Sequence, residues 1–79
     1  MIGKLKEMID EYFRIKREHI APVQFIIEGY EGMSNVSTID SQEAIIKISI
    51  IPDFTEEIGN LISELKNIYR LEEIKKPDI

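Results

Sequence analysis

Residues 19–40 read His-Ile-Ala-Pro-Val-Gln-Phe-Ile-Ile-Glu-Gly-Tyr-Glu-Gly-Met-Ser-Asn-Val-Ser-Thr-Ile-Asp. This stretch contains two of the four glycines and one of the three prolines of the chain. Considered alone, its apolar middle at residues 23–27 has the composition of a buried strand. Whether the stretch is extended or helical decides the architecture of the whole protein.

A longer window favours a helix over residues 20–31. Pro22 then falls in the first turn, where a helix tolerates proline, and Gly32 stands where a left-handed C-cap is favoured. Gly29 lies inside this helix, at a cost of about 1 kcal/mol relative to alanine. The apolar side chains that share one face of the helix are Ile20, Val23, Ile26, Ile27 and Tyr30.

Two strands are predicted after this helix, over residues 34–40 and 44–51, because β-favouring residues flank a turn-forming run at residues 40–43. A long amphipathic helix follows Pro52, with Asp53 as its N-cap and Glu56 as the capping partner. Its expected apolar face consists of Phe54, Ile58, Leu61, Ile62, Leu65, Ile68 and Tyr69.

The ends of the chain complete the topology. Residues 12–17 alternate well enough for a strand with Phe13 and Ile15 inward, and residues 69–74 fit a short edge strand. The order is that of a ferredoxin-like βαββαβ sandwich, an α+β fold with an antiparallel sheet and two helices on one face. The alternative is an αβββα meander with one long N-terminal helix. The predicted core consists of Val23, Ile27, Val36, Ile46, Ile48, Ile50, Ile58, Leu61 and Leu65.

Size and cysteine content limit how this fold is stabilised. The 79 residues have room for one domain, predicted over residues 12–74, with an amphipathic extension over 1–11 and a tail over 75–79. Cysteine is absent, so no disulfide or thiolate–metal site contributes. A core this small seldom supplies more than about 3–5 kcal/mol. We therefore expect self-association, most simply as a homodimer.

Charge and hydropathy exclude two classes of partner. Residues 21–64 contain one lysine against eight carboxylates, within a chain of net charge −5. Nucleic-acid backbones bind clustered Lys and Arg, so no nucleic-acid partner is expected. The apolar runs are too short to span a membrane, and the N-terminus lacks the uninterrupted apolar region of a signal peptide. We expect a cytoplasmic protein with no membrane partner.

The chain contains the run Phe-Ile-Ile-Glu-Gly-Tyr-Glu-Gly over residues 25–32, followed by Ser-Thr-Ile-Asp over residues 37–40 and a Pro-Asp turn. In these motifs it resembles a family of short uncharacterised bacterial domains common in clostridia. This resemblance covers residues 12–74 and implies no chemistry, because the family carries no established activity. More distantly, the architecture is similar to ACT regulatory domains. Those usually have a glycine between the first strand and first helix, where an amino acid binds, and residues 17–20 have none.

The candidate catalytic groups do not form a catalytic pattern. His19 is the only histidine and no cysteine is present to pair with it, so we expect a capping or exposed residue at the start of a helix. Glu28, Glu31 and Asp40 are the only plausible metal donors near it, and their spacing matches no known metal motif. We therefore predict that the protein is not an enzyme and has no metal or cofactor.

The remaining prediction is a protein-interaction or regulatory module that acts as a homo-oligomer or with a protein partner. The alternative is an ACT-like domain that senses a small molecule. Gly29 lies beside Phe25 on the helix face turned away from the sheet, and the outer face of residues 44–51 is half apolar. The expected interaction or ligand surface consists of Phe25, Glu28, Gly29, Tyr30, Glu31, Gly32, Ile45 and Ile51.

Overall fold

The computed structural model describes residues 7–30 and 32–78. A short 3-10 turn precedes each helix: η1 (Arg17–His19) before the first and η2 (Pro52–Phe54) before the second. In chain order, the other elements are β1 (Ile9–Arg14), α1 (Ile20–Glu28), β2 (Ser34–Asp40), β3 (Ile45–Ile50), α2 (Thr55–Tyr69) and β4 (Glu72–Ile74).

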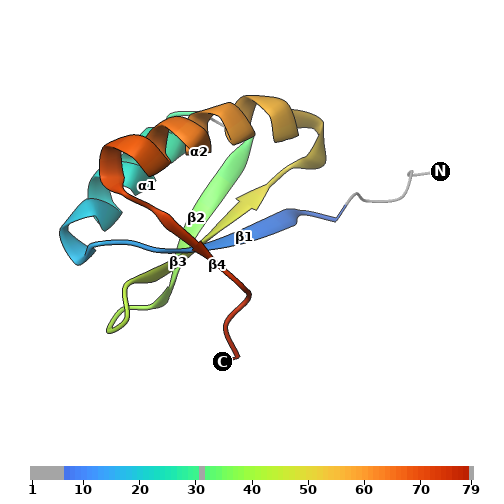
Figure 1. The fold of residues 1–79 in the computed structure, drawn as a ribbon. Helices are drawn as coiled ribbons and strands as arrows, with labels where there is room; N and C mark the ends of the chain where they lie inside the picture. Colours follow the sequence, from blue (N-terminus) through green and yellow to red (C-terminus); the bar gives the residue numbers. More distant parts are fainter. Residues whose placement is uncertain (1–6, 31, 79) are drawn as a thin grey trace.

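The four strands form one sheet in the order β2-β3-β1-β4, and every neighbouring pair is antiparallel. Both helices cover the same face of this sheet (Figure 1). The α+β architecture is therefore confirmed and is compatible with the predicted ferredoxin-like sandwich. The αβββα alternative is wrong, because residues 9–14 form a strand between β3 and β4. No helix in the described ranges is long and apolar enough to cross a membrane.

The core lies between the sheet and the two helices. The alternating isoleucines of β3 direct one face toward the helices, and β1 adds Phe13, which pairs with Ile46. All nine predicted core residues are buried, at 9% exposure or less. The cluster also contains Phe13 and Ile15, which were expected to point inward, and Ile62, which was expected on the apolar face of the second helix. Its two remaining members, Ala44 and Leu71, were not predicted.

Several boundaries differ from the prediction. β1 begins at Ile9, three residues before the predicted start, so the sheet reaches into the segment expected to be an extension. Ile15 still donates its N–H to the Ala44 carbonyl at 3.0 Å, but the chain then turns into η1 instead of continuing as a strand to residue 17. The extension's apolar residues Ile2 and Leu5 lie outside the described residues.

The β2–β3 hairpin has the predicted turn at residues 40–43. The Asp40 carboxylate accepts hydrogen bonds from the N–H groups of Gln42 and Glu43, both at 3.0 Å. Such a side-chain-to-backbone turn is the usual role of Asp at this position. The register shifts between Thr38 and Asp40, and Ala44 adopts a positive φ of 56° as the chain enters β3.

The helix ends depart from the predicted caps. Phe54 occupies the N-cap position of α2, not Asp53, because the chain first forms η2. α2 ends at Arg70 in the left-handed conformation, with φ 59° and ψ 46°. Left-handed geometry costs a non-glycine residue roughly 1–2 kcal/mol. Ile68, expected on the buried face of α2, is 65% exposed.

Candidate functional site

The predicted surface residues lie in separate parts of the molecule. Phe25 and Glu28 are exposed on α1, and Gly29, Tyr30 and Gly32 belong to the turn between α1 and β2. Ile45 and Ile51 belong to β3 and to the residue after it. Glu31 lies outside the described residues.

Phe25 stands on the outer face of α1 and is 81% exposed. Its neighbours one turn away along the helix are Ala21 and Gly29, which are also exposed. Since both residues are small, neither places a large side chain against the aromatic ring of Phe25. We call Ala21, Phe25 and Gly29 the outer row of α1. Phe25 lies on the face of α1 turned away from the sheet, and its role in an interaction surface stays a prediction.

The turn after α1 differs from the prediction at both glycines. Gly29 is the C-cap of α1 instead of an internal residue, and its N–H donates to the carbonyls of Phe25 and Ile26 at 3.1 and 3.2 Å. A Cβ at this position would lie 3.2 Å from the Ile26 carbonyl oxygen. Gly32 has the expected positive φ, 77°, but four residues beyond the last residue of the helix. It therefore shapes the entry into β2.

The outer face of β3 is less accessible than its alternation suggests. Ile45 is 5% exposed and Ser49 is 7% exposed, although neither belongs to the core beneath the helices. Ser49 donates its hydroxyl to the Asp10 carboxylate of β1 at 2.8 Å. Ile51 is half-buried, and its N–H donates to the Met33 carbonyl at 2.9 Å. Ile45 therefore offers little surface to a partner in this conformation.

His19 joins the start of α1 to the end of α2. Its Nδ1–H donates to the carbonyl oxygen of Tyr69 at 3.2 Å, and its ring meets the Tyr69 ring edge-on, with centroids 5.2 Å apart. It occupies the N-cap position of α1 without a side-chain capping bond there. A carbonyl at the end of a helix is one of those left without an intrahelical donor, so His19 caps the C-terminus of α2.

The carboxylates considered as metal donors have local roles. Glu28 accepts a hydrogen bond from Gln24 one turn earlier at 3.1 Å, and Asp40 is engaged in the hairpin turn. Within residues 7–30 and 32–78, no group of three metal-ligating side chains is close enough to hold an ion.

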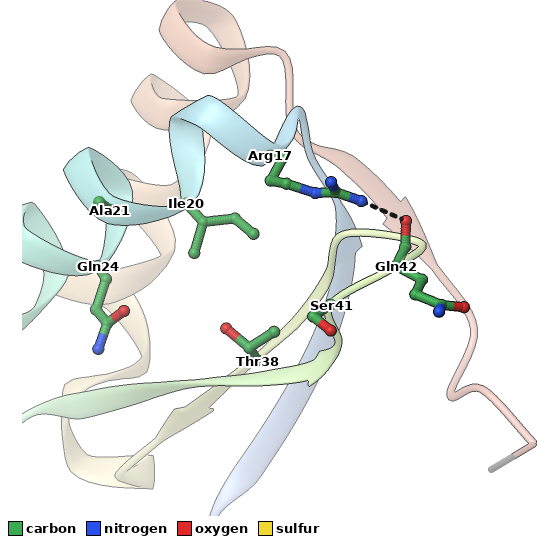
Figure 2. Close-up of a pocket in the computed structure, with 7 residues that line it drawn as sticks. All are labelled: Arg17, Ile20, Ala21, Gln24, Thr38, Ser41 and Gln42. Atoms are coloured by element: carbon green, nitrogen blue, oxygen red, sulfur yellow. Dashed lines mark hydrogen bonds between the residues drawn. The ribbon is translucent and has the colours of Figure 1, made fainter.

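A groove of about 490 Å³ lies between the start of α1 and the β2–β3 hairpin (Figure 2). Ile20 points from the helix into the groove toward Thr38, and the Arg17 guanidinium closes one end by donating to the Gln42 carbonyl at 3.0 Å. The lining residues are Arg17, Ile20, Ala21, Gln24, Thr38, Ser41 and Gln42. Its volume is within the range of small-molecule sites.

None of these groove residues was predicted as a site residue. They come from two segments about twenty residues apart, and neither segment contains a motif. Only the sheet order, with β2 at the edge beneath α1, brings them together. The sequence pointed to the groove only indirectly. It predicted both the hairpin and the start of the helix, but it did not predict that the two lie side by side.

The carboxyl group of Glu11 on β1 has a shifted pKa. Burial raises the pKa of Glu11 on β1 above its ordinary value, and the Glu73 carboxylate of β4 raises it further, whereas Lys66 lowers it. Lys66 donates to Glu73 at 3.1 Å and stands 5.8 Å from the centroid of the Phe13 ring. The two carboxylates thus compete for one ammonium group at the β1–β4 edge.

A raised pKa means that the folded protein binds a proton at Glu11 more tightly than the unfolded chain does. Stability should therefore fall as pH rises from the unfolded-state pKa, about 4.3 for glutamate, through the higher folded-state pKa. We expect Glu11→Gln to stabilise the protein at pH 7 by less than about 1 kcal/mol, because the group is partly solvated. The gain should vanish near pH 3, where Glu11 is protonated in both states.

Urea unfolding at pH 7 and near pH 3 measures this difference. Glu43→Gln, which removes an exposed carboxylate from the hairpin, controls for the change in net charge. Equal effects of Glu11→Gln at both pH values would contradict the assignment.

The family model described as "Domain of unknown function (DUF4911)" matches residues 13–68. This span runs from β1 to the last turn of α2. No curated protein and no solved structure matches the chain.

Proposed function

The chain belongs to the DUF4911 family of domains of unknown function, and we propose that it is a non-enzymatic protein-interaction module that pairs with a second copy of itself. We assign its βαββαβ order to the ferredoxin-like class and place it in the cytoplasm. The pairing surface is the outer row of α1. The observation that carries this proposal is the 81% exposure of Phe25.

Exposing Phe25 gives up a large stabilisation. Burying a phenylalanine side chain contributes about 1.5–3 kcal/mol relative to leaving it in water. Nothing in the fold requires an aromatic residue here, because the core face of α1 is filled by Val23 and Ile27. An aromatic ring flanked by small residues is well suited to insert into a complementary surface.

The outer row of α1 is complementary to itself. If two copies of α1 cross about a twofold axis, Phe25 of one copy packs over the small residues Ala21 and Gly29 of the other. Because Gly29 has no side chain, the axes of the two α1 helices can approach to the distance of about 8–10 Å that helix packing requires. Twofold pairing of identical patches is the commonest form of homo-oligomer.

The non-enzymatic part of the proposal rests on what the reactive side chains already do. His19 is held between the two helices by its bond to Tyr69, and the carboxylates Glu28 and Asp40 have local hydrogen bonds. None of these groups is poised beside a nucleophile.

Sedimentation at micromolar concentration tests the pairing. We expect the wild type to sediment with twice the chain mass and Phe25→Ser to sediment as a monomer, its dimer dissociation constant raised at least 30-fold, about 2 kcal/mol. Because Phe25 is exposed, the unfolding free energy of the isolated chain should change by less than about 0.5 kcal/mol. Phe25→Leu, which keeps most of the apolar area, is the matched control and should remain dimeric.

Ala21→Glu is an independent variant. An acidic residue in the first turn favours the helix, so the fold should be retained, while two like charges at the twofold axis should separate the copies. A wild type that is monomeric at all concentrations would refute the pairing. So would a dimer that Phe25→Ser and Ala21→Glu leave intact.

The groove between α1 and the hairpin favours a second candidate function, small-molecule sensing. It combines one cation, two hydroxyls and apolar side chains in a volume of about 490 Å³. A ligand that binds only the folded state raises its melting temperature by mass action. Thermal unfolding with and without a metabolite mixture tests this function, and Thr38→Val should abolish any metabolite-specific rise that the groove causes.

A further inference from the structure

Four basic side chains lie at one end of this acidic protein. The chain has ten lysines and arginines, and four of them, Arg14, Lys16, Arg17 and Arg70, flank the β1–α1 connection and the turn from α2 to β4. Figure 1 shows both connections at the same end of the sheet. β1 and β4 are paired there, with Arg14 opposite Glu72.

A small cleft of about 270 Å³ opens at this end. Its lining residues are Arg14, Ile15, Lys16, Arg70 and Glu72. Arg17 is not among the residues that line this cleft, because it belongs to the groove beside the hairpin. We call it the basic cleft.

The charges of the basic cleft are not neutralised by the residues described around it. The single ion pair, between Arg14 and Glu72, spans 3.9 Å with both side chains about half exposed or more, so it holds Arg14 only weakly. No ion pair or side-chain hydrogen bond joins Lys16 or Arg70 to another described residue. The C-terminal dipole of α2 is equivalent to about half a negative charge. Three cations against one carboxylate therefore leave an excess of positive charge.

Arg70 supplies an independent observation. It ends α2 in the left-handed conformation, the position at which glycine is favoured. Residues held in strained backbone conformations of this kind cluster at functional sites. The Arg70 side chain makes no ion pair or side-chain hydrogen bond with another described residue, and it lines the basic cleft.

We infer that the basic cleft binds a small, multiply charged oxyanion, such as a phosphorylated or polycarboxylate metabolite. Two guanidinium groups supply bidentate donors for such oxygens, and the ammonium of Lys16 adds a point charge. The site does not depend on the proposed pairing through α1, since it shares no residue with the outer row.

Isothermal titration with inorganic pyrophosphate, and separately with citrate, tests the inference. We expect saturable binding of one anion per chain for at least one of them, and the tighter of the two distinguishes a phosphate from a carboxylate ligand. Sodium chloride at matched ionic strength controls for general screening. The inference would be overturned if neither anion bound saturably. It would also be overturned if sodium chloride, added to the same ionic strength as the anion, abolished the binding.

Arg70→Gly is the decisive variant, because its two expected effects have opposite directions. Removing the strain should raise the unfolding midpoint of the free protein by about 2–6 °C, while loss of a charge-assisted contact should weaken anion binding about 10- to 100-fold. Lys16→Gln should also weaken binding. Lys47→Gln, which removes the same charge from β3 outside the cleft, should not. Undiminished binding by Arg70→Gly, or equal losses in Lys16→Gln and Lys47→Gln, would contradict the site.

Discussion

Phe13→Ala should lower the free energy of unfolding by about 3–5 kcal/mol, the range measured for truncating a buried phenylalanine. Phe13 is fully buried on a central strand of the sheet, opposite Ile46. A core of this size seldom supplies more than about 3–5 kcal/mol in total. The variant should therefore be largely unfolded near physiological temperature.

The expected cost has two parts. The first is the transfer free energy of the lost ring, and the second is the cavity left between β1 and α2, which the surrounding isoleucines cannot fill without moving. Lys66 also loses the ring beside its ammonium group, a smaller contribution at this partly exposed position.

Circular dichroism during urea titration measures the effect. Phe13→Leu, which keeps an apolar side chain of similar reach, is the control and should cost clearly less than the alanine variant. A Phe13→Ala protein within about 1 kcal/mol of the wild type would show that β1 does not occupy the centre of the sheet in solution.

Long periodic segments explain why most of the fold was predictable. The alternation of Ile46, Ile48 and Ile50 admits one inward face only, and the 3-4 spacing of Ile58, Leu61 and Leu65 admits one helical face. These six residues are in the core as expected. Such a pattern is compatible with only one orientation of the strand or helix against the core.

The boundaries were less predictable because tertiary contacts set them. The local pattern at residues 12–17 fits a strand, but pairing with β3 begins at Ile9 and ends at Arg14. The chain must then leave the sheet to place His19 against Tyr69. No signal within residues 12–17 records the position of α2, so the local pattern could not locate the end of β1.

The candidate sites were predictable only in part. Exposure of Phe25 follows from the helical period of residues 20–28, because Val23 and Ile27 must face the sheet. The basic cleft could not be anticipated in this way. It combines residues 14–16 with residues 70–72, which are adjacent only because β4 returns beside β1.

Ile45 shows where the period-two pattern fails. Its alternation with Ile46 places it on the sheet face without helices, where an exposed apolar residue was expected. In the folded chain it is nevertheless 5% exposed, between Arg14 on β1 and Asp40 on β2. On a central strand, long side chains of both neighbouring strands can cover a residue that no helix covers.

Ile45→Lys should therefore destabilise the single chain, by about 2–4 kcal/mol, instead of only separating two copies. The new ammonium group would be placed in a site closed to water and directly opposite Arg14, a like charge. Like charges on opposite residues of paired strands are unfavourable. The Asp40 carboxylate opposite Ile45 on β2 offsets this repulsion only in part, because its Oδ1 is held toward the N–H groups of Gln42 and Glu43 in the hairpin turn.

Urea unfolding at a concentration where the protein is monomeric measures this effect without interference from pairing. Ile45→Val should cost only about 0.5–1.5 kcal/mol, because it keeps the site apolar. Asn35→Lys places the same charge on the same face at an exposed position of β2 and should change stability by less than about 0.5 kcal/mol. If Ile45→Lys is as stable as Asn35→Lys, the side chain at position 45 reaches water. The outer face of the sheet would then again be open to a partner.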